Sequence, residues 1–168
     1  MSFKEIMPEL LTDNPFKLIG SDWMLITAGT PEAFNTMTAS WGGLGILWER
    51  KVGFCFIRPT RYTYEFIEQS EHFTLSFFED RFRKALTYCG THSGRDGDKI
   101  KEASLTPVKE GGVIYFAEAR LVLVCRKLYF QDINPDRFLD PAIESMYPKK
   151  DYHRMYVGEI KKCLTKES

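Results

Sequence analysis

Two short segments of this chain carry the residue types that bind a phosphorylated ligand. Residues 35–43 read Asn-Thr-Met-Thr-Ala-Ser-Trp-Gly-Gly and put small hydroxyl donors and glycines where a strand should end or turn. Residues 58–63 read Arg-Pro-Thr-Arg-Tyr-Thr and place two guanidinium groups and two threonine hydroxyls at an expected helix start. A doubly ionised phosphate binds hydroxyls, bidentate arginines and the positive end of a helix dipole. The two segments therefore predict a site for a phosphorylated small molecule.

The second segment is the stronger phosphate candidate. Arg58 follows a strand end, Pro59 suits a turn, and Thr60 or Thr63 can cap the helix that follows. The first N–H groups of that helix would point to the same place. A capped helix with solvated arginines would look the same in isolation. The hydroxyl run at 36–40, one strand away, favours the ligand.

Two further segments could contribute, and each also has an ordinary structural explanation. Residues 89–99 form a loop rich in glycine and paired charges, which can bend around a ligand or simply face solvent. His153 stands at the mouth of the expected last strand, as a polar contact, a proton donor or a hydrogen-bonded surface residue. No Ser-His-Asp, Cys-His or paired-carboxylate pattern stands out. A bound cofactor would therefore have to supply any difficult chemical step.

The elements expected to position these residues are mostly strands. Apolar and alternating runs predict strands over 23–28, 36–40, 52–57, 73–77, 113–116, 119–130 and 155–164. Helices are expected over 63–71, 80–89, 98–103 and 140–146, with Asp80 as an N-cap and Gly90 just after a helix end. Residues 73–77 alternate as a half-buried strand does. About six strands without regular βαβ alternation favour a mainly β fold, a closed or nearly closed antiparallel barrel with helices outside.

Length and charge limit the class of protein. The chain has 168 residues, enough for a single domain over 1–168 with a real core. It carries 23 basic and 23 acidic residues, which disfavours nucleic acid as a partner. No apolar run reaches membrane-spanning length, and the first residues lack the layout of a signal peptide, so we expect a cytoplasmic protein.

The four cysteines are expected to be reduced, buried thiols. Cys55, Cys89, Cys125 and Cys163 are widely spaced, and three of them fall in expected strands. Cys89 and His92 have a metal-ligand spacing but lack a second ligand pair, so no metal site is predicted.

Four pieces of the sequence, in order, resemble the flavin reductase-like family and especially its flavoredoxin branch. They span about residues 15–163: the Asn-x-x-Thr-Ala-Ser element at 35–40, the Pro-x-Arg-x-Thr element at 59–63, the Ser-Gly-Arg-Asp-x-Asp-Lys loop at 93–99, and the His…Gly-Glu strand from 153 to 159. The resemblance implies an FMN-binding split barrel, Greek-key-like, that works as a homodimer. FMN is the implied cofactor rather than FAD.

The resemblance also implies roles for individual residues. The residues that would line the flavin are Asn35, Thr36, Met37, Thr38, Ala39, Ser40 and Trp41. The segment expected to hold the phosphate contributes Arg58, Pro59, Thr60, Arg61 and Thr63. The loop that would close the pocket contributes Cys89, Ser93, Gly94, Arg95, Asp96 and Lys99. His153 corresponds to a histidine near the nicotinamide-binding face. Trp41 is bulkier than the residue many reductases carry and is expected to decide whether a nicotinamide enters.

Three functions stay open at this point. The chain could be an NAD(P)H-dependent flavin oxidoreductase, with NADH or NADPH as co-substrate. It could instead be a flavoredoxin-type electron carrier that takes electrons from a protein redox partner, or a flavin-binding barrel without catalysis. In the first two, the protein supplies binding, orientation and tuning of the flavin.

Overall fold

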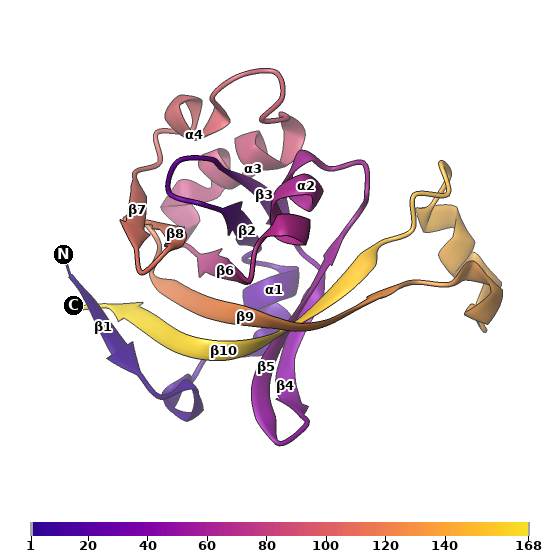
Figure 1. The fold of residues 1–168 in the computed structure, drawn as a ribbon, viewed down its shortest axis with the longest axis horizontal. Coiled ribbons are helices and arrows are strands. Elements are labelled where there is room, and N and C mark those ends of the chain that lie inside the picture. The colour runs from indigo at the N-terminus through magenta and orange to yellow at the C-terminus, as the bar shows by residue number, and fades with distance from the viewer. Residues whose placement is uncertain (1, 168) are drawn as a thin grey trace.

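The computed structural model describes residues 2–167, and its centre is one curved antiparallel sheet (Figure 1). Eight strands take part, in the order β3-β2-β6-β9-β10-β5-β4, with β1 paired to the C-terminal end of β10. Their bounds are β1 Phe3–Ile6, β2 Met24–Gly29, β3 Phe34–Ala39, β4 Gly42–Leu47, β5 Arg50–Ile57, β6 His72–Phe77, β9 Leu121–Asp132 and β10 Arg154–Lys166. A separate hairpin joins β7 (Pro107–Glu110) to β8 (Val113–Phe116).

The two edges of the sheet, β3 and β4, follow one another in the chain without pairing. Only Ser40 and Trp41 separate the end of β3 from Gly42, the first residue of β4. The two edges are thus brought together at this connection, and the barrel is split there. Gly42 permits the close approach, because a Cβ at that position would lie 2.6 Å from the carbonyl oxygen of Phe54. The predicted split β barrel is confirmed, although residues 2–167 form ten strands rather than about six.

Short helices surround this sheet. The α-helices are α1 Pro15–Gly20, α2 Tyr62–Gln69, α3 Arg83–Thr91 and α4 Lys99–Glu102, and the 3-10 helices are η1 Pro8–Leu10, η2 Asp80–Phe82, η3 Pro135–Arg137 and η4 Pro141–Met146. Two of them, η3 and η4, lie in a segment that projects from the sheet (Figure 1). In Figure 1, α2, α3 and α4 gather on the side of the barrel where β2 and β3 lie. None of the helices described between residues 2 and 167 has the length and apolar character needed to cross a membrane.

Two apolar clusters hold the strands and helices together. One includes Met24, Ile26, Phe73, Leu75 and Tyr156, and the other lies under α3 and β8 and includes Leu25, Leu86, Phe116, Val122 and Val124. Burying one such side chain contributes roughly 1.5–3 kcal/mol. All four cysteines are free and buried, as predicted.

Strand β6 differs from its expected half-buried state. Its alternating polar residues are also enclosed: Thr74 is 1% exposed and Ser76 is 0% exposed. The β7–β8 hairpin covers that face, and the Thr74 hydroxyl donates to the carbonyl oxygen of Ile114 at 2.6 Å. The alternation therefore reflects two different buried environments.

Helix α3 also differs from the expected span of 80–89. Residues Asp80–Phe82 form a separate 3-10 turn, and α3 then runs from Arg83 to Thr91. Gly90 lies inside the helix and does not end it. A Cβ on Gly90 would lie 3.2 Å from Cβ of Thr38, so the glycine lets α3 pack closely on β3.

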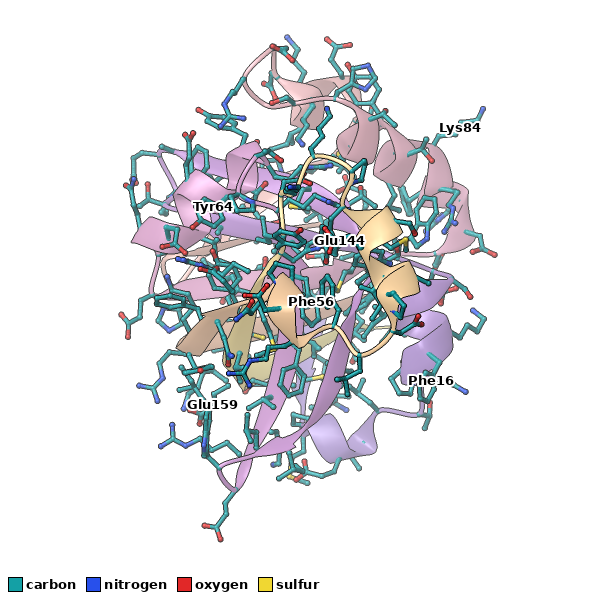
Figure 2. All side chains as sticks on the ribbon, turned by 90° about the vertical axis from the view of Figure 1, so that its right-hand side faces the viewer. Phe16, Phe56, Tyr64, Lys84, Glu144 and Glu159 are labelled. Atoms are coloured by element: carbon teal, nitrogen blue, oxygen red, sulfur yellow. The ribbon has the colours of Figure 1, made fainter. Side chains whose placement is uncertain are left out.

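The long strands β9 and β10 carry residues 133–153 at their far end, and this segment projects from the body of the molecule (Figure 1). The helix expected over 140–146 is the 3-10 helix η4, whose N-cap Asp140 accepts from the backbone N–H of Ala142. Figure 2 looks onto this segment, with Glu144 of η4 near the middle of the view. We call residues 133–153 the projecting segment.

Candidate functional site

A cavity of about 240 Å³ lies between β3, the start of α2 and the loop that follows α3. We call it the basic cavity. Its lining combines cations with hydroxyl and amide groups: Asn35, Met37, Thr60, Arg61, Tyr62, Thr63, Gly90, Thr91, His92, Ser93, Arg95 and Lys99. The fold therefore brings together the segments 58–63 and 89–99, which lie about 30 residues apart in sequence.

Lys99 is a buried cation in this wall, with only 5% of its surface exposed. Its ammonium donates to the carbonyl oxygens of Cys89 at 3.0 Å and His92 at 3.1 Å. An ammonium has three donors, so one hydrogen is left over. Burial lowers the pKa of Lys99 to about 8, and Arg61 adds to the lowering.

Arg61 is the second cation of the basic cavity. The only hydrogen bond of its side chain among the described residues is a long one, 3.5 Å, to the carbonyl oxygen of Gly90. Burial, and then Arg58, lowers the pKa of this guanidinium. No ion pair formed within residues 2–167 includes Arg61 or Lys99. Two desolvated cations without a carboxylate favour an anionic ligand between them.

The hydroxyls of this region make other contacts than the predicted helix caps. Helix α2 begins after Arg61, and no side chain caps it. The Thr63 hydroxyl accepts from the side-chain amide of Asn35 at 2.9 Å, which leaves its own hydrogen free. The Thr60 hydroxyl donates to Asp151 at 3.4 Å. Thr60 and Thr63 thus serve the cavity wall and not the helix end, because tertiary partners compete with local capping.

A second cavity of about 230 Å³ adjoins the first and shares Met37 and Arg61 with it. We call it the histidine cavity. It opens at the split between β3 and β4 and is lined by Met37, Thr38, Ala39, Ser40, Trp41, Phe56, Arg58, Arg61 and His153. Phe56, near the centre of Figure 2, lies close to His153, with ring centroids 6.4 Å apart.

His153 and Trp41 form the aromatic wall of the histidine cavity. Their ring centroids are 5.0 Å apart, and His153 is only 8% exposed. Nδ1 of His153 lies 2.7 Å from the hydroxyl of Tyr147. Burial, followed by Arg58, lowers the pKa of His153 to about 4. The imidazole is therefore neutral at neutral pH.

Arg58 lies in the histidine cavity and not with the expected phosphate cluster. It forms an ion pair with Asp151 at 2.9 Å and donates to the carbonyl oxygen of Met146 at 3.0 Å. Its guanidinium also stacks over the ring of Tyr147, 4.7 Å from the centroid. Arg58 is thus already neutralised and ties the projecting segment to the barrel.

Other predicted site residues line neither cavity. The hydroxyl of Thr36, fully buried, contacts that of Thr27 at 2.9 Å inside the barrel. The remaining residues outside both linings are Pro59, Cys89, Gly94 and Asp96. Pro59 shapes the turn before α2, and Cys89 contributes its carbonyl oxygen to Lys99. Gly94 packs on Asn35, whose Oδ1 would lie 2.2 Å from an added Cβ.

The Gly158-Glu159 pair of the last strand has a structural explanation. A Cβ on Gly158 would lie 2.6 Å from the ring of Phe73 and 2.7 Å from Cβ of Cys125. Glu159 pairs with Arg126 at 3.1 Å. These residues hold β10 in the sheet, and His153 is the part of that motif that reaches a cavity.

Three contributors to the site were missed by sequence reasoning. Phe56 lines the histidine cavity, while Tyr147 and Asp151 hold His153 and Arg58. Phe56 reads as an ordinary residue of an apolar strand. Tyr147 and Asp151 contact the site from a loop that the sequence does not place.

Comparison with known proteins gives a family and a fold. The model of the flavin reductase like domain matches residues 16–168. The flavoredoxin of Desulfovibrio vulgaris (Miyazaki F) superposes with a TM-score of 0.68 at 21% identity, over 98% of this chain and 78% of that one. The FMN-binding domain of a flavin reductases-like enzyme from Shewanella baltica OS155 gives 0.68 at 15% identity, over 98% and 77%.

A third solved structure carries a nicotinamide nucleotide in its description. The NADH:FAD oxidoreductase SgcE6 of Streptomyces globisporus C-1027 superposes with a TM-score of 0.64 at 16% identity, over 86% of this chain and 74% of that one. A search of curated protein sequences gives no match.

Proposed function

Because the chain belongs to the flavin reductase-like family, we propose that it binds FMN and passes hydride or electrons through the bound flavin. The observation that carries this proposal is the pair of cations, the half-buried Arg61 and the buried Lys99, that lack a carboxylate partner and line a cavity next to the histidine cavity. A ligand with an anionic end and a planar end matches both.

The basic cavity would hold the phosphate. Arg61 and Lys99 supply charge-assisted donors, and the hydroxyls of Thr60, Thr63 and Ser93 surround them. The first N–H groups of α2 add to the positive potential. FMN is proposed as the flavin rather than FAD, in line with the FMN-binding domain from Shewanella baltica OS155 to which the chain is similar.

The histidine cavity would hold the polar part of the ring. Ser40, Arg58 and His153 offer hydrogen-bond donors there, and Trp41 offers an aromatic face. Bound FMN would supply the reversible uptake of a hydride or of single electrons. The side chains of the cavity bind and orient the ring and restrict access of water to it.

NADH or NADPH is the proposed electron donor. Trp41 is 40% exposed at the mouth of the histidine cavity and would contact an incoming nicotinamide. The second candidate is an electron carrier that takes electrons from a protein partner, favoured by the size of this tryptophan at the entrance. Solved relatives include both a flavoredoxin and an NADH:FAD oxidoreductase.

A homodimer forms part of the proposal. The projecting segment and the strands that carry it expose large apolar side chains, among them Leu139 at 98%, Phe130 at 53% and Met146 at 50%. Burial of such a surface is favourable, and a second copy is the expected cover. The mass of the protein in solution, measured by light scattering, tests this directly.

An absorption spectrum of the purified protein, with added FMN and then with NADH or NADPH under anaerobic conditions, tests the function. Binding of FMN with bleaching by a nucleotide supports the reductase. Binding with bleaching only by dithionite supports the electron carrier. A protein that leaves added FMN fluorescence unquenched, and remains colourless, contradicts both.

A further inference from the structure

The hydroxyl of Tyr147 and the imidazole of His153 form a buried pair at the base of the projecting segment. Their polar atoms are 2.7 Å apart, and the residues are 4% and 8% exposed. No other side-chain bond of the Tyr147 hydroxyl occurs in the part of the chain that the structure describes. The two groups therefore determine each other's hydrogen positions.

Several contacts hold the phenol of Tyr147 in place. Arg58 stacks on one side of its ring, and Arg58 is itself fixed by Asp151. Phe138 and Tyr152 pack on the same ring, with centroids 6.2 Å and 4.9 Å away. The hydroxyl thus cannot swing away from Nδ1 without repacking the segment.

The direction of this hydrogen bond follows from the chemistry of both groups. Burial raises the pKa of Tyr147, so the phenol keeps its proton. His153 is neutral, and a neutral imidazole has one N–H and one acceptor nitrogen. If Nδ1 were the donor, the buried phenol hydrogen would lack an acceptor, and an unsatisfied buried donor is unfavourable. Nδ1 therefore accepts, and the imidazole hydrogen is on Nε2.

The Nε2–H group adds to a wall that offers donors. Arg58, Arg61 and the hydroxyl of Ser40 line the same cavity, beside the flat ring of Trp41. We propose that Tyr147 is a positioning residue that fixes His153 as its Nε2–H tautomer, so that the imidazole donates to a carbonyl oxygen of a planar ligand. The ligand's identity rests on the proposed function, and the tautomer does not.

Nitrogen-15 NMR of the full chain, with and without FMN, tests the tautomer. The chain contains three histidines, so His153→Gln assigns the signals of residue 153 by their absence. We expect Nε2 to have a pyrrole-type shift and Nδ1 a pyridine-type shift near pH 7. The reverse pattern in the wild-type protein overturns the proposal, whatever the fate of any variant.

Tyr147→Phe removes the hydroxyl and keeps the ring. We expect a mixture of tautomers at His153 in this variant. The matched control is Tyr152→Phe, because the Tyr152 hydroxyl binds Glu144 and the ring packs on Tyr147 without such a bond to His153. A tautomer that is unchanged in Tyr147→Phe overturns the proposal.

The carbonyl oxygen could belong to the flavin ring or to the carboxamide of a nicotinamide, and two measurements distinguish them. A flavin carbonyl predicts that Tyr147→Phe weakens riboflavin and FMN alike, by roughly three- to tenfold, the value of one neutral hydrogen bond. A carboxamide predicts the same change in KM for NADH with unchanged flavin affinity. If Tyr147→Phe loses the tautomer but changes neither the flavin affinity nor the KM for NADH, the proposed contact with a carbonyl oxygen is overturned. Wild-type protein that binds no flavin contradicts the proposed function and leaves the tautomer result standing.

Discussion

The basic cavity and the histidine cavity adjoin one another and share Arg61, yet their cations differ in whether they have a carboxylate partner. In the basic cavity, Arg61 and Lys99 lack a carboxylate partner, and only the more exposed Arg95 has one, Glu65 at 2.6 Å. In the histidine cavity, Arg58 is paired with Asp151, which lies 93 positions further along the chain. An arginine with a carboxylate partner acts as scaffold, whereas a buried cation without one indicates where an anionic ligand binds.

The two cavities also differ in how the chain builds them. The basic cavity is formed by the start of α2 and the loop after α3, which pack side by side against β3. The histidine cavity depends on the projecting segment, which returns to the barrel only through contacts such as Arg58 with Asp151 and Tyr147 with His153. A single substitution should therefore disturb the shape of the basic cavity less than that of the histidine cavity.

The largest expected effect comes from removing a cation of the basic cavity, which would weaken the binding of the phosphate and leave the binding of the flavin ring unchanged. Lys99→Met and Arg61→Ala should each lower the affinity for FMN relative to riboflavin by roughly 10- to 150-fold, since a charge-assisted hydrogen bond contributes about 1.5–3 kcal/mol. Fluorescence titration with both flavins gives the ratio. Lys101→Met, an exposed lysine on the same short helix, is the control and should leave the ratio unchanged. An unchanged ratio in both test variants would place the phosphate elsewhere.

That comparison also shows what the sequence could predict. Thr60, Arg61 and Lys99 share one cavity because short motifs next to turns keep their geometry in the fold. Arg58 could not be assigned, since its partner Asp151 is remote in sequence and nothing local announces the pair. Thr36 differs from the residues that follow it: its hydroxyl contacts Thr27 inside the barrel, whereas residues 37–41 line the histidine cavity. Which of these residues reach a cavity depends on the neighbouring strands and helices, which the local sequence does not specify.

The same distinction between local and remote determinants applies to the fold. The strands with strong apolar patterns were predicted, and so was the closed antiparallel class of barrel. Strand β4 was missed, because its Gly-Gly-Leu-Gly start resembles a turn and only contact with Phe54 explains it. Gly90 looked like a helix end, while its real constraint is Thr38 across the α3–β3 interface.

The second expected effect is a pH dependence confined to the basic cavity. The pKa of Lys99 is lowered to about 8, so its ammonium prevails below that pH and is lost as the pH rises through it. The affinity for FMN should therefore fall about tenfold between pH 7 and pH 9. It should also fall below pH ~6, where the phosphate takes up its second proton.

Riboflavin provides the internal control for this profile. It lacks the phosphate, and His153, with a pKa of about 4, stays neutral over the same range. Its affinity should be flat from pH 6 to pH 9, and Lys99→Met should flatten the alkaline side of the FMN profile. If the affinity for riboflavin changes with pH as the affinity for FMN does, the titrating group contacts the flavin ring and not the phosphate.

A smaller effect is expected from the loop that closes the basic cavity. Gly94→Ala would place a Cβ 2.2 Å from Oδ1 of Asn35, which must move and lose its bond to Thr63. We expect the FMN affinity to fall about fivefold, equivalent to roughly 1 kcal/mol. Gly97→Ala is the matched control, because nothing lies within 4 Å of its added Cβ. Equal affinities for the two variants would show that Asn35 does not shape the cavity.

The smallest change in the ratio of FMN to riboflavin affinity is expected at Arg58, the cation of the histidine cavity that has a carboxylate partner. Arg58→Ala should leave the ratio of FMN to riboflavin affinity within about twofold of the wild type, because the guanidinium is already paired with Asp151. Its effect should appear in the projecting segment, where the tie to Met146 and Tyr147 is lost. Hydrogen exchange measured by mass spectrometry should then be faster over 141–147 than over α2. A ratio that falls as far as in Arg61→Ala would mean that Arg58 leaves Asp151 to bind the phosphate, and the two cavities would then act as one anion site.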